Sequence, residues 1–140
     1  MAKIRDAAQM ADFTEIVLPK YDGHFAVEDF SEGLAAVNSS KTDSGERKYG
    51  FIDKTGSEII SPEFISAGNY TEGFASVCVK TPNGKKTVLI DKAGRIVVPP
   101  KYDYIGEFTN GMARFYINKE GLFGNGYETI WGFIKRTPLT

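Results

Sequence analysis

The sequence predicts an all-β repeat protein, and two observations lead to that class. Three imperfect copies of one segment fill the 140 residues, and their turn glycines, Gly33, Gly73 and Gly111, lie 40 and then 38 residues apart. Within each copy, short apolar runs alternate with glycine-containing turns, as in strands joined by hairpins. A period of this length is typical of repeat proteins, whose units bury their apolar faces against each other.

Each copy contains three expected strands, which we name A, B and C. Strand A follows the turn glycine and alternates apolar with small residues, so that its alanines allow another layer to approach closely. The strands A are residues 33–37, 73–79 and 111–116; the strands B are 51–52, 89–90 and 133–134; the strands C are 16–18, 59–60 and 96–98.

The connections between strands B and C have the pattern of a tight hairpin. Asp53-Lys54-Thr55-Gly56 and Asp91-Lys92-Ala93-Gly94 each begin with aspartate and end with glycine. This order predicts a type I turn that closes with a left-handed glycine. Pro19, Pro62 and Pro100 follow the strands C, and we expect them to end those strands, because proline cannot donate to a β-ladder.

The chain begins with a strand C and ends with a strand B. The last A–B pair therefore lacks its strand C, and residues 16–18 would complete it by pairing with residues 131–135. Such pairing protects strand edges. We expect three antiparallel three-stranded sheets in a pseudo-threefold arrangement, with the N-terminal strand completing the last sheet. Residues 1–14 are predicted to form an arm or short helix, and residues 15–140 a single domain.

Several of these elements recur together in a known family. Trp131-Gly132-Phe133-Ile134, Tyr49-Gly50-Phe51-Ile52-Asp53-Lys54-Thr55-Gly56, and the stretch from Pro100-Lys101-Tyr102-Asp103 to Gly111 resemble the WG repeat family over about residues 15–135. The third copy keeps Trp-Gly, whereas the first has Tyr49-Gly50 and the second Thr87-Val88. The family is mostly bacterial and largely without assigned activity. The resemblance implies a β-rich interaction module and not a particular reaction.

Charge and composition narrow the class of partner. The net charge is −1, so no bulk charge attracts nucleic acid, and nucleic acid is an unlikely partner on this ground. No apolar run has the length of a membrane span, and residues 1–6 lack the apolar centre of a signal peptide. We therefore expect a cytoplasmic protein without membrane insertion. The single cysteine, Cys78, cannot form an internal disulfide.

Catalytic chemistry has little support in the sequence. His24 is the one histidine, and Cys78 lies in an apolar strand pattern unlike that of an activated thiolate. Asp53 and Asp91 recur, but Lys135 takes their place in the third copy, which favours turn chemistry over a carboxylate pair. No phosphate loop or zinc spacing is present. We expect a protein that is not an enzyme and that uses no cofactor or metal.

Recurring aromatic residues allow two interpretations. One set of recurring aromatic residues is Tyr21, Phe64 and Tyr102, and the other is Phe30, Tyr70 and Phe108. Aromatic side chains most often fill the core, so we predict that Phe30, Tyr70 and Phe108 are buried between sheets. Exposed, they could instead stack on sugar rings. Asp22 and Asp103 are expected to accept local backbone N–H groups and not to bind metal.

Insertions in repeat proteins collect on one face, which is frequently the binding face. The connections between strands A and B, residues 39–48, 80–86 and 118–127, differ most among the copies. We expect them to share one end and to form the binding site, with an apolar anchor and a basic surround that steers an acidic partner. The expected site residues are Leu122, Phe123, Tyr127, Arg47, Lys80, Lys85 and Lys86.

These observations favour a non-enzymatic module that binds a protein, such as an adaptor or an inhibitor or immunity partner. A carbohydrate or cell-envelope binding module is the alternative.

Overall fold

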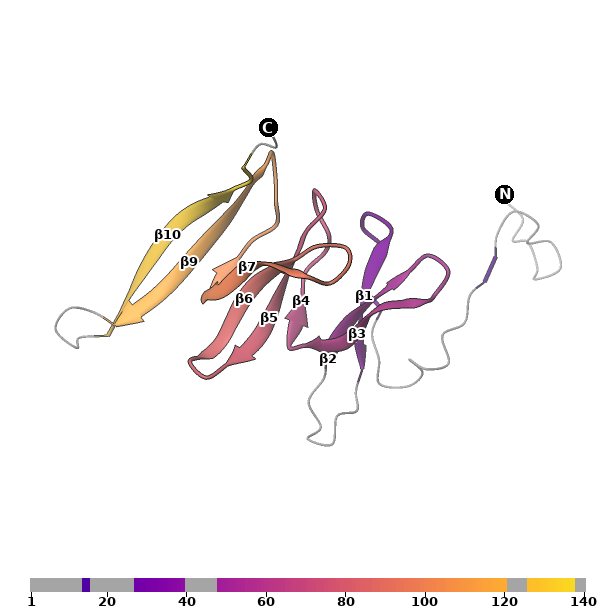
Figure 1. Cartoon of the computed structure of the whole chain (residues 1–140), viewed down its shortest axis with the longest axis horizontal. Helices are drawn as coiled ribbons and strands as arrows, with labels where there is room; N and C mark the ends of the chain where they lie inside the picture. The colour runs from indigo at the N-terminus through magenta and orange to yellow at the C-terminus, as the bar shows by residue number, and fades with distance from the viewer. Residues whose placement is uncertain (1–13, 16–26, 40–47, 121–125, 138–140) are drawn as a thin grey trace, which may run out of the picture.

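The computed structural model describes residues 14–15, 27–39, 48–120 and 126–137, which form three antiparallel sheets (Figure 1). Sheet 1 contains β1 (Leu34–Ser39), β2 (Lys48–Asp53) and β3 (Glu58–Phe64). Sheet 2 contains β4 (Ser66–Ala67), β5 (Ala75–Thr81), β6 (Gly84–Ile90) and β7 (Ile96–Tyr102). Sheet 3 contains β8 (Tyr104–Ile105), β9 (Met112–Glu120) and β10 (Tyr127–Lys135).

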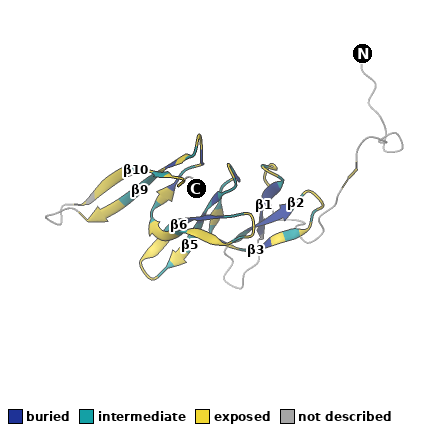
Figure 2. Cartoon of the chain, turned by 45° about the horizontal axis from the view of Figure 1, so that its top comes forward, coloured by how far each residue is buried: buried dark blue, intermediate teal, exposed yellow. Residues whose placement is uncertain are grey.

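The predicted all-β class with three sheets is confirmed. Figure 1 shows the sheets in a row with sheet 2 in the middle, and Figure 2 shows the same order from a second direction. The predicted pseudo-threefold arrangement is not confirmed. The strand expected at residues 16–18 and the arm or helix expected at residues 1–13 lie outside the described residues.

Each repeat contains one more element than the sequence analysis expected. A short strand precedes strand A and pairs with it: β4 pairs with β5, β8 pairs with β9, and Val27 forms a single bridge with Val37. A complete unit therefore has the order short strand, A, B, C. Sheet 2 contains all four strands, whereas sheet 3 ends at strand B.

The turns before the strands A are two-residue hairpins. In the first, Ser31 and Leu34 exchange backbone hydrogen bonds of 2.9 and 3.1 Å, and Glu32 and Gly33 have φ angles of 53° and 84°. Two successive positive φ angles define a type I′ turn. The turn glycines of the other two copies, Gly73 and Gly111, are left-handed as well. The left-handed conformation of the residue before each glycine was not predicted.

The predicted B–C hairpins are also confirmed. Gly56 has a φ of 85° and donates to the Asp53 carbonyl at 3.0 Å, while the Asp53 carboxylate accepts the backbone N–H groups of Thr55 and Ser57. Asp91 makes the same turn with Gly94. The hydrogen bond from the Thr55 hydroxyl is the main reason that the pKa of Asp53 is lowered.

The prediction that prolines end the strands C is wrong. Pro62 and Pro100 lie inside β3 and β7. Tyr49 pairs with Phe64 and Phe51 with Ile60, so Gly50 alone faces the three residues 61–63. The proline therefore sits in a bulge, where its missing N–H costs no ladder hydrogen bond. Pro19 lies outside the described residues.

Aromatic residues fill the junctions between sheets. Tyr70 is fully buried against Phe51 with ring centroids 4.9 Å apart, and its hydroxyl donates to the Asp91 carbonyl at 2.6 Å. Phe108 is buried between sheets 2 and 3 with Phe74 and Leu89. The predicted burial of Tyr70 and Phe108 is confirmed. Burial raises the pKa of the Tyr70 hydroxyl.

The predicted burial of Phe30 is wrong, because its side chain is 45% exposed. Tyr70 and Phe108 each pack between their own sheet and the preceding one. Phe30 occupies the same place in the first unit, and no described sheet precedes it. In the other aromatic set Phe64 is buried and Tyr102 half-buried, while Tyr21 lies outside the described residues.

Neighbouring units are also joined through their turns. The Glu32 carboxylate accepts the Gly73 N–H at 2.8 Å, and the Glu72 carboxylate accepts the Gly111 N–H at 3.1 Å. We call these contacts the turn clamps. Burial opposes ionisation of Glu32, but the hydrogen bonds from Gly73 and Glu72 and the charge of Lys92 outweigh it, so its pKa is lowered.

Candidate binding surface

The side of sheet 3 that faces away from sheet 2 is an exposed aromatic surface, which we call the outer face. Ala113, Phe115 and Ile134 point toward sheet 2 and pack there, so the residues that alternate with them point away. The outer face consists of Tyr104, Met112, Arg114, Tyr116, Trp131 and Phe133.

Three rings on this face form a ladder across the three strands. Tyr104 of β8 stacks on Tyr116 of β9 with centroids 5.2 Å apart and an interplanar angle of 17°. Tyr116 in turn contacts Trp131 of β10 at 5.0 Å. The Arg114 guanidinium lies 5.3 Å from the Trp131 ring centre, a cation–π distance. The ladder is therefore preorganised and carries one cation.

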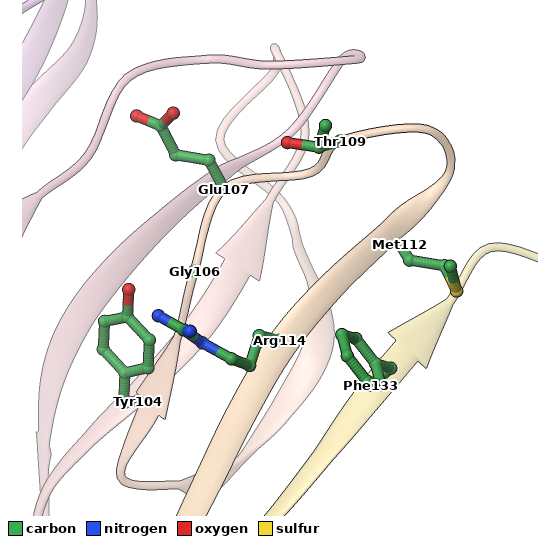
Figure 3. Close-up of a pocket in the computed structure, with 7 residues that line it drawn as sticks. All are labelled: Tyr104, Gly106, Glu107, Thr109, Met112, Arg114 and Phe133. Atoms are coloured by element: carbon green, nitrogen blue, oxygen red, sulfur yellow. The ribbon is translucent and has the colours of Figure 1, made fainter.

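Beside the ladder lies an open hollow of about 620 Å³. Figure 3 shows Arg114 between Tyr104 and Phe133, with Met112 above Phe133. Glu107 and Thr109 line the same hollow from the segment between β8 and β9. The hollow thus combines apolar walls with one cationic and one anionic side chain.

The outer face corresponds to surfaces that are covered in the other sheets. Phe133 occupies the repeat position of Phe51 and Leu89, which are 0% and 2% exposed beneath the next sheet. Phe133 is 68% exposed and Trp131 57% exposed. Figure 2 shows β10 mostly as exposed, in contrast to β1 and β2. Exposed large apolar patches of this kind mark interaction sites.

β10 also has an edge with which no described strand pairs, and we call it the free edge. β2 and β6 each pair on both sides, with a strand A and a strand C. Among the described strands β10 pairs with β9 alone, so its other edge presents backbone N–H and C=O groups that no described strand takes up. An edge of this kind can accept an added strand, with main-chain hydrogen bonds giving affinity.

The loop site expected from the sequence is described only in part. Arg47, Leu122 and Phe123 lie outside the described residues, and Tyr127 is placed at the start of β10 by its backbone alone. Lys80 and Lys85 are exposed and directly opposite each other at the end of the β5–β6 hairpin. Like charges in this position repel, so an acidic partner would relieve the repulsion.

Lys86 is engaged inside the protein. Its ammonium forms a 2.8 Å ion pair with the Asp103 carboxylate, whose other oxygen accepts the Asn118 N–H at 2.7 Å. The expectation of a local backbone contact for Asp103 is therefore wrong, because Asn118 belongs to β9. Burial opposes ionisation of Asp103, but the bonds from Lys86 and Asn118 outweigh it and lower its pKa.

The described residues offer little for metal binding or nucleophilic chemistry. Cys78 is half-buried in β5 opposite Thr87, and His24 lies outside the described ranges. In the described part of the chain, no three His, Cys, Asp or Glu side chains gather where they could hold a metal ion. That part also contains no helix suited to crossing a membrane.

Sequence reasoning missed the outer face, although a signal for it was present. Arg114 and Tyr116 alternate along the last strand A, and they replace smaller residues of the earlier copies.

Comparison with known proteins agrees with the repeat pattern. The family model described as "WG containing repeat" matches residues 12–39, 49–80 and 89–121. No curated protein and no solved structure gives a significant match.

Proposed function

We propose that this chain, which belongs to the WG-repeat family, is a non-enzymatic module that binds another protein through the outer face and free edge of sheet 3. The observation that supports the proposal most is the exposure of Phe133 and Trp131 at positions that the next sheet covers elsewhere. The few residues that dominate the binding energy of protein interfaces are enriched in tryptophan, tyrosine and arginine.

The basic hairpin end is a second element of the proposal. Lys80 and Lys85 would steer an acidic protein surface, and their effect would appear mainly in the association rate. The residues expected from the sequence in the neighbouring connections, Leu122, Phe123, Tyr127 and Arg47, remain predicted contacts. A module of this kind would act as an adaptor, or as an inhibitor or immunity partner, in a bacterial cytoplasm.

Trp131 provides a direct test, because it is the single tryptophan of the chain and lies on the proposed site. A protein captured from cells of the source organism would be purified and titrated against the chain while Trp131 fluorescence is followed. We expect Arg114→Ala with Phe133→Ala to weaken binding about thirtyfold or more, as removal of interface hot spots does.

Ile96→Ala is the matched control, because Ile96 is an exposed apolar residue on β7, away from the outer face. It should bind like the unchanged chain. Equal affinity of the double variant and the control would place the binding site elsewhere. Charge reversal at Lys80 and Lys85 should slow association and change its salt dependence, with a smaller effect on dissociation.

Carbohydrate binding is the second candidate, and the ladder of Tyr104, Tyr116 and Trp131 is the observation that favours it. Exposed flat rings can stack on sugar rings. The recurring aromatics Phe64, Tyr70 and Phe108 do not contribute, because they are buried. Titration with soluble polysaccharides and cell-wall fragments, again followed by Trp131 fluorescence, tests this candidate. A saturable response to a sugar alone would favour it over protein binding.

A further inference from the structure

We propose that the outer face binds an extended segment of a partner protein in which one acidic side chain stands between two apolar ones, with one residue separating each from the next. The acidic side chain would pair with Arg114, and the apolar side chains would pack on the residues to either side of it. The inference rests on the proposed function, because it names the chemistry of the segment that occupies the same site.

Four residues of the outer face are much larger than their counterparts in sheet 2. They are Tyr104, Arg114, Tyr116 and Trp131, and their counterparts are Ser66, Ser76, Cys78 and Thr87. On the opposite face of β9 the size is kept, since Ala113 matches Ala75. The fold therefore does not require the large residues. They would also prevent another sheet from packing as closely as sheet 3 packs on sheet 2, so a single extended segment fits this surface better than a sheet does.

Arg114 presents a cation that lacks an anionic partner in the described part of the chain. Its guanidinium lies 5.3 Å from the Trp131 ring centre, and none of the described residues forms an ion pair or a hydrogen bond with it. Glu107 lines the same hollow, but its carboxylate points away from Arg114 (Figure 3). A guanidinium stacked on a ring keeps its N–H groups available, and their fork matches the two oxygens of a carboxylate. The site therefore favours a carboxylate.

Tyr104 offers a second donor to the same carboxylate. Arg114 extends toward Tyr104, and both side chains line the hollow (Figure 3). A side chain at Gly106 would crowd the Tyr104 hydroxyl, because a Cβ there would lie 3.2 Å from the hydroxyl oxygen. The glycine therefore leaves the hydroxyl open, and the hydroxyl can donate a hydrogen bond to a bound carboxylate.

The spacing along β9 sets the pattern of the segment. Met112, Arg114 and Tyr116 stand at every second residue of this strand, so neighbours are about 7 Å apart. Alternate side chains of an extended segment have the same spacing, so a segment along β9 can place an acidic residue over Arg114 and an apolar residue over each neighbour. Toward the start of β9 the apolar residue would meet Met112 and Phe133. Toward its end it would meet Tyr116 and Trp131.

The walls of the hollow limit what else the segment can carry. Phe133 and Met112 are exposed and offer apolar area to a bound side chain. Glu107 lines the same hollow and would repel a second acidic side chain. We therefore expect the segment to contain one acidic residue between apolar residues and not a run of acidic residues.

Titration with short synthetic peptides tests the inference. The probe is a peptide with both ends capped and the core Leu-Ser-Glu-Ser-Leu, and binding is followed by Trp131 fluorescence. One control peptide carries Gln in place of Glu, and the other contains the same five residues in the order Leu-Leu-Ser-Ser-Glu. We expect saturable binding of the probe and at least tenfold weaker binding of both controls, because the first loses the charge and the second the spacing.

Arg114→Glu should reverse the charge preference of the site. Arg114 is exposed, so the fold should persist, and circular dichroism checks that it does. The variant should bind the probe at least tenfold more weakly than the unchanged chain does, and it should prefer a peptide with Lys in place of Glu. Lys101→Glu is the matched control, because Lys101 is an exposed cation beside the Tyr102 ring on β7 and the net charge changes by the same amount. It should bind the probe like the unchanged chain.

Equal binding of the probe and its Gln control would overturn the inference, and so would the lack of saturable binding of the probe. A saturable response to an acidic polysaccharide, with none to the probe, would overturn it as well. The captured partner protein distinguishes this failure from failure of the proposed function. If its affinity falls in Phe133→Ala and is unchanged in Arg114→Gln, the outer face binds a protein without the acidic contact.

Discussion

Phe30 and Phe108 occupy the same repeat position in opposite environments. Phe108 is enclosed between two sheets, whereas Phe30 has a described sheet on one side only. Phe108→Ala should therefore reduce the free energy of unfolding by about 3–5 kcal/mol, as for other buried aromatics. Phe30→Ala should cost below about 1 kcal/mol, the range of surface changes. Urea denaturation measures both, and equal costs would contradict the assigned environments.

Gly50 and Gly132 are the two glycines of the Tyr-Gly and Trp-Gly pairs, and a side chain would meet different obstacles at each. A Cβ at Gly50 would lie 2.3 Å from the Ile60 carbonyl oxygen, which the β3 bulge holds in place. At Gly132 the obstacle is the Phe115 ring at 2.6 Å, which can rotate. Overpacking costs about 1–3 kcal/mol.

We expect Gly50→Ala to lie at or above the upper end of that range and Gly132→Ala near its lower end. Thermal unfolding of the two variants compares them directly. A larger loss for Gly132→Ala would mean that Phe115 is held more firmly than the bulge backbone.

At the scale of single elements, the ion pair of Lys86 and Asp103 ties β6 to the segment between β7 and β8. The folded state lowers the pKa of Asp103 from its ordinary value of 3.8. The resulting stabilisation is complete above about pH 3.8, the ordinary pKa of the group, and is lost as the pH falls through the lower pKa of the folded state. Asp103→Asn should therefore be less stable than the unchanged chain at neutral pH. The difference should shrink below pH 3.8 in chemical denaturation, and a constant difference down to pH 2 would contradict this assignment.

Most elements follow from local sequence. The Asp53–Gly56 hairpin and the left-handed Gly33 need nothing beyond turn chemistry, and the buried alanines of the strands A follow from alternation. β4 and β8 could not be predicted in this way, because a two-residue strand has no periodicity to detect. The prediction for Pro62 failed because proline usually ends a strand. Its place in a bulge depends on the facing strand β2 and cannot be read from the local sequence.

The outer face was harder to predict than the strands. If all copies are assumed to be equivalent, Phe30 should be buried like Tyr70, and Phe133 like Phe51. Their exposure depends instead on whether a sheet precedes Phe30 and whether one follows Phe133. That difference is a property of the row and not of the repeat. The row itself is set by how successive sheets pack, which no single copy encodes.

At the scale of the whole molecule, a row of units has unequal ends and a protected middle. Sheet 2 packs against a sheet on both faces, while β10 has one free edge and an exposed face. Amide hydrogen exchange should therefore be slowest in β6, at Val88 and Leu89, and fastest along β10, at Ile130 and Trp131. Equal protection of β6 and β10 would show that the chain opens as one cooperative unit.

The turn clamps also bear on how such a chain can evolve. The second turn carries both a carboxylate for the next turn, from Glu72, and an amide for the previous one, from Gly73. A gene duplication that adds one whole unit of about 38–40 residues would therefore reproduce both halves of every clamp. An insertion of another length within the recurring strands would leave a carboxylate facing no amide. The clamps are therefore compatible with the gain or loss of complete repeats, whereas a partial repeat would break the contact between neighbouring turns.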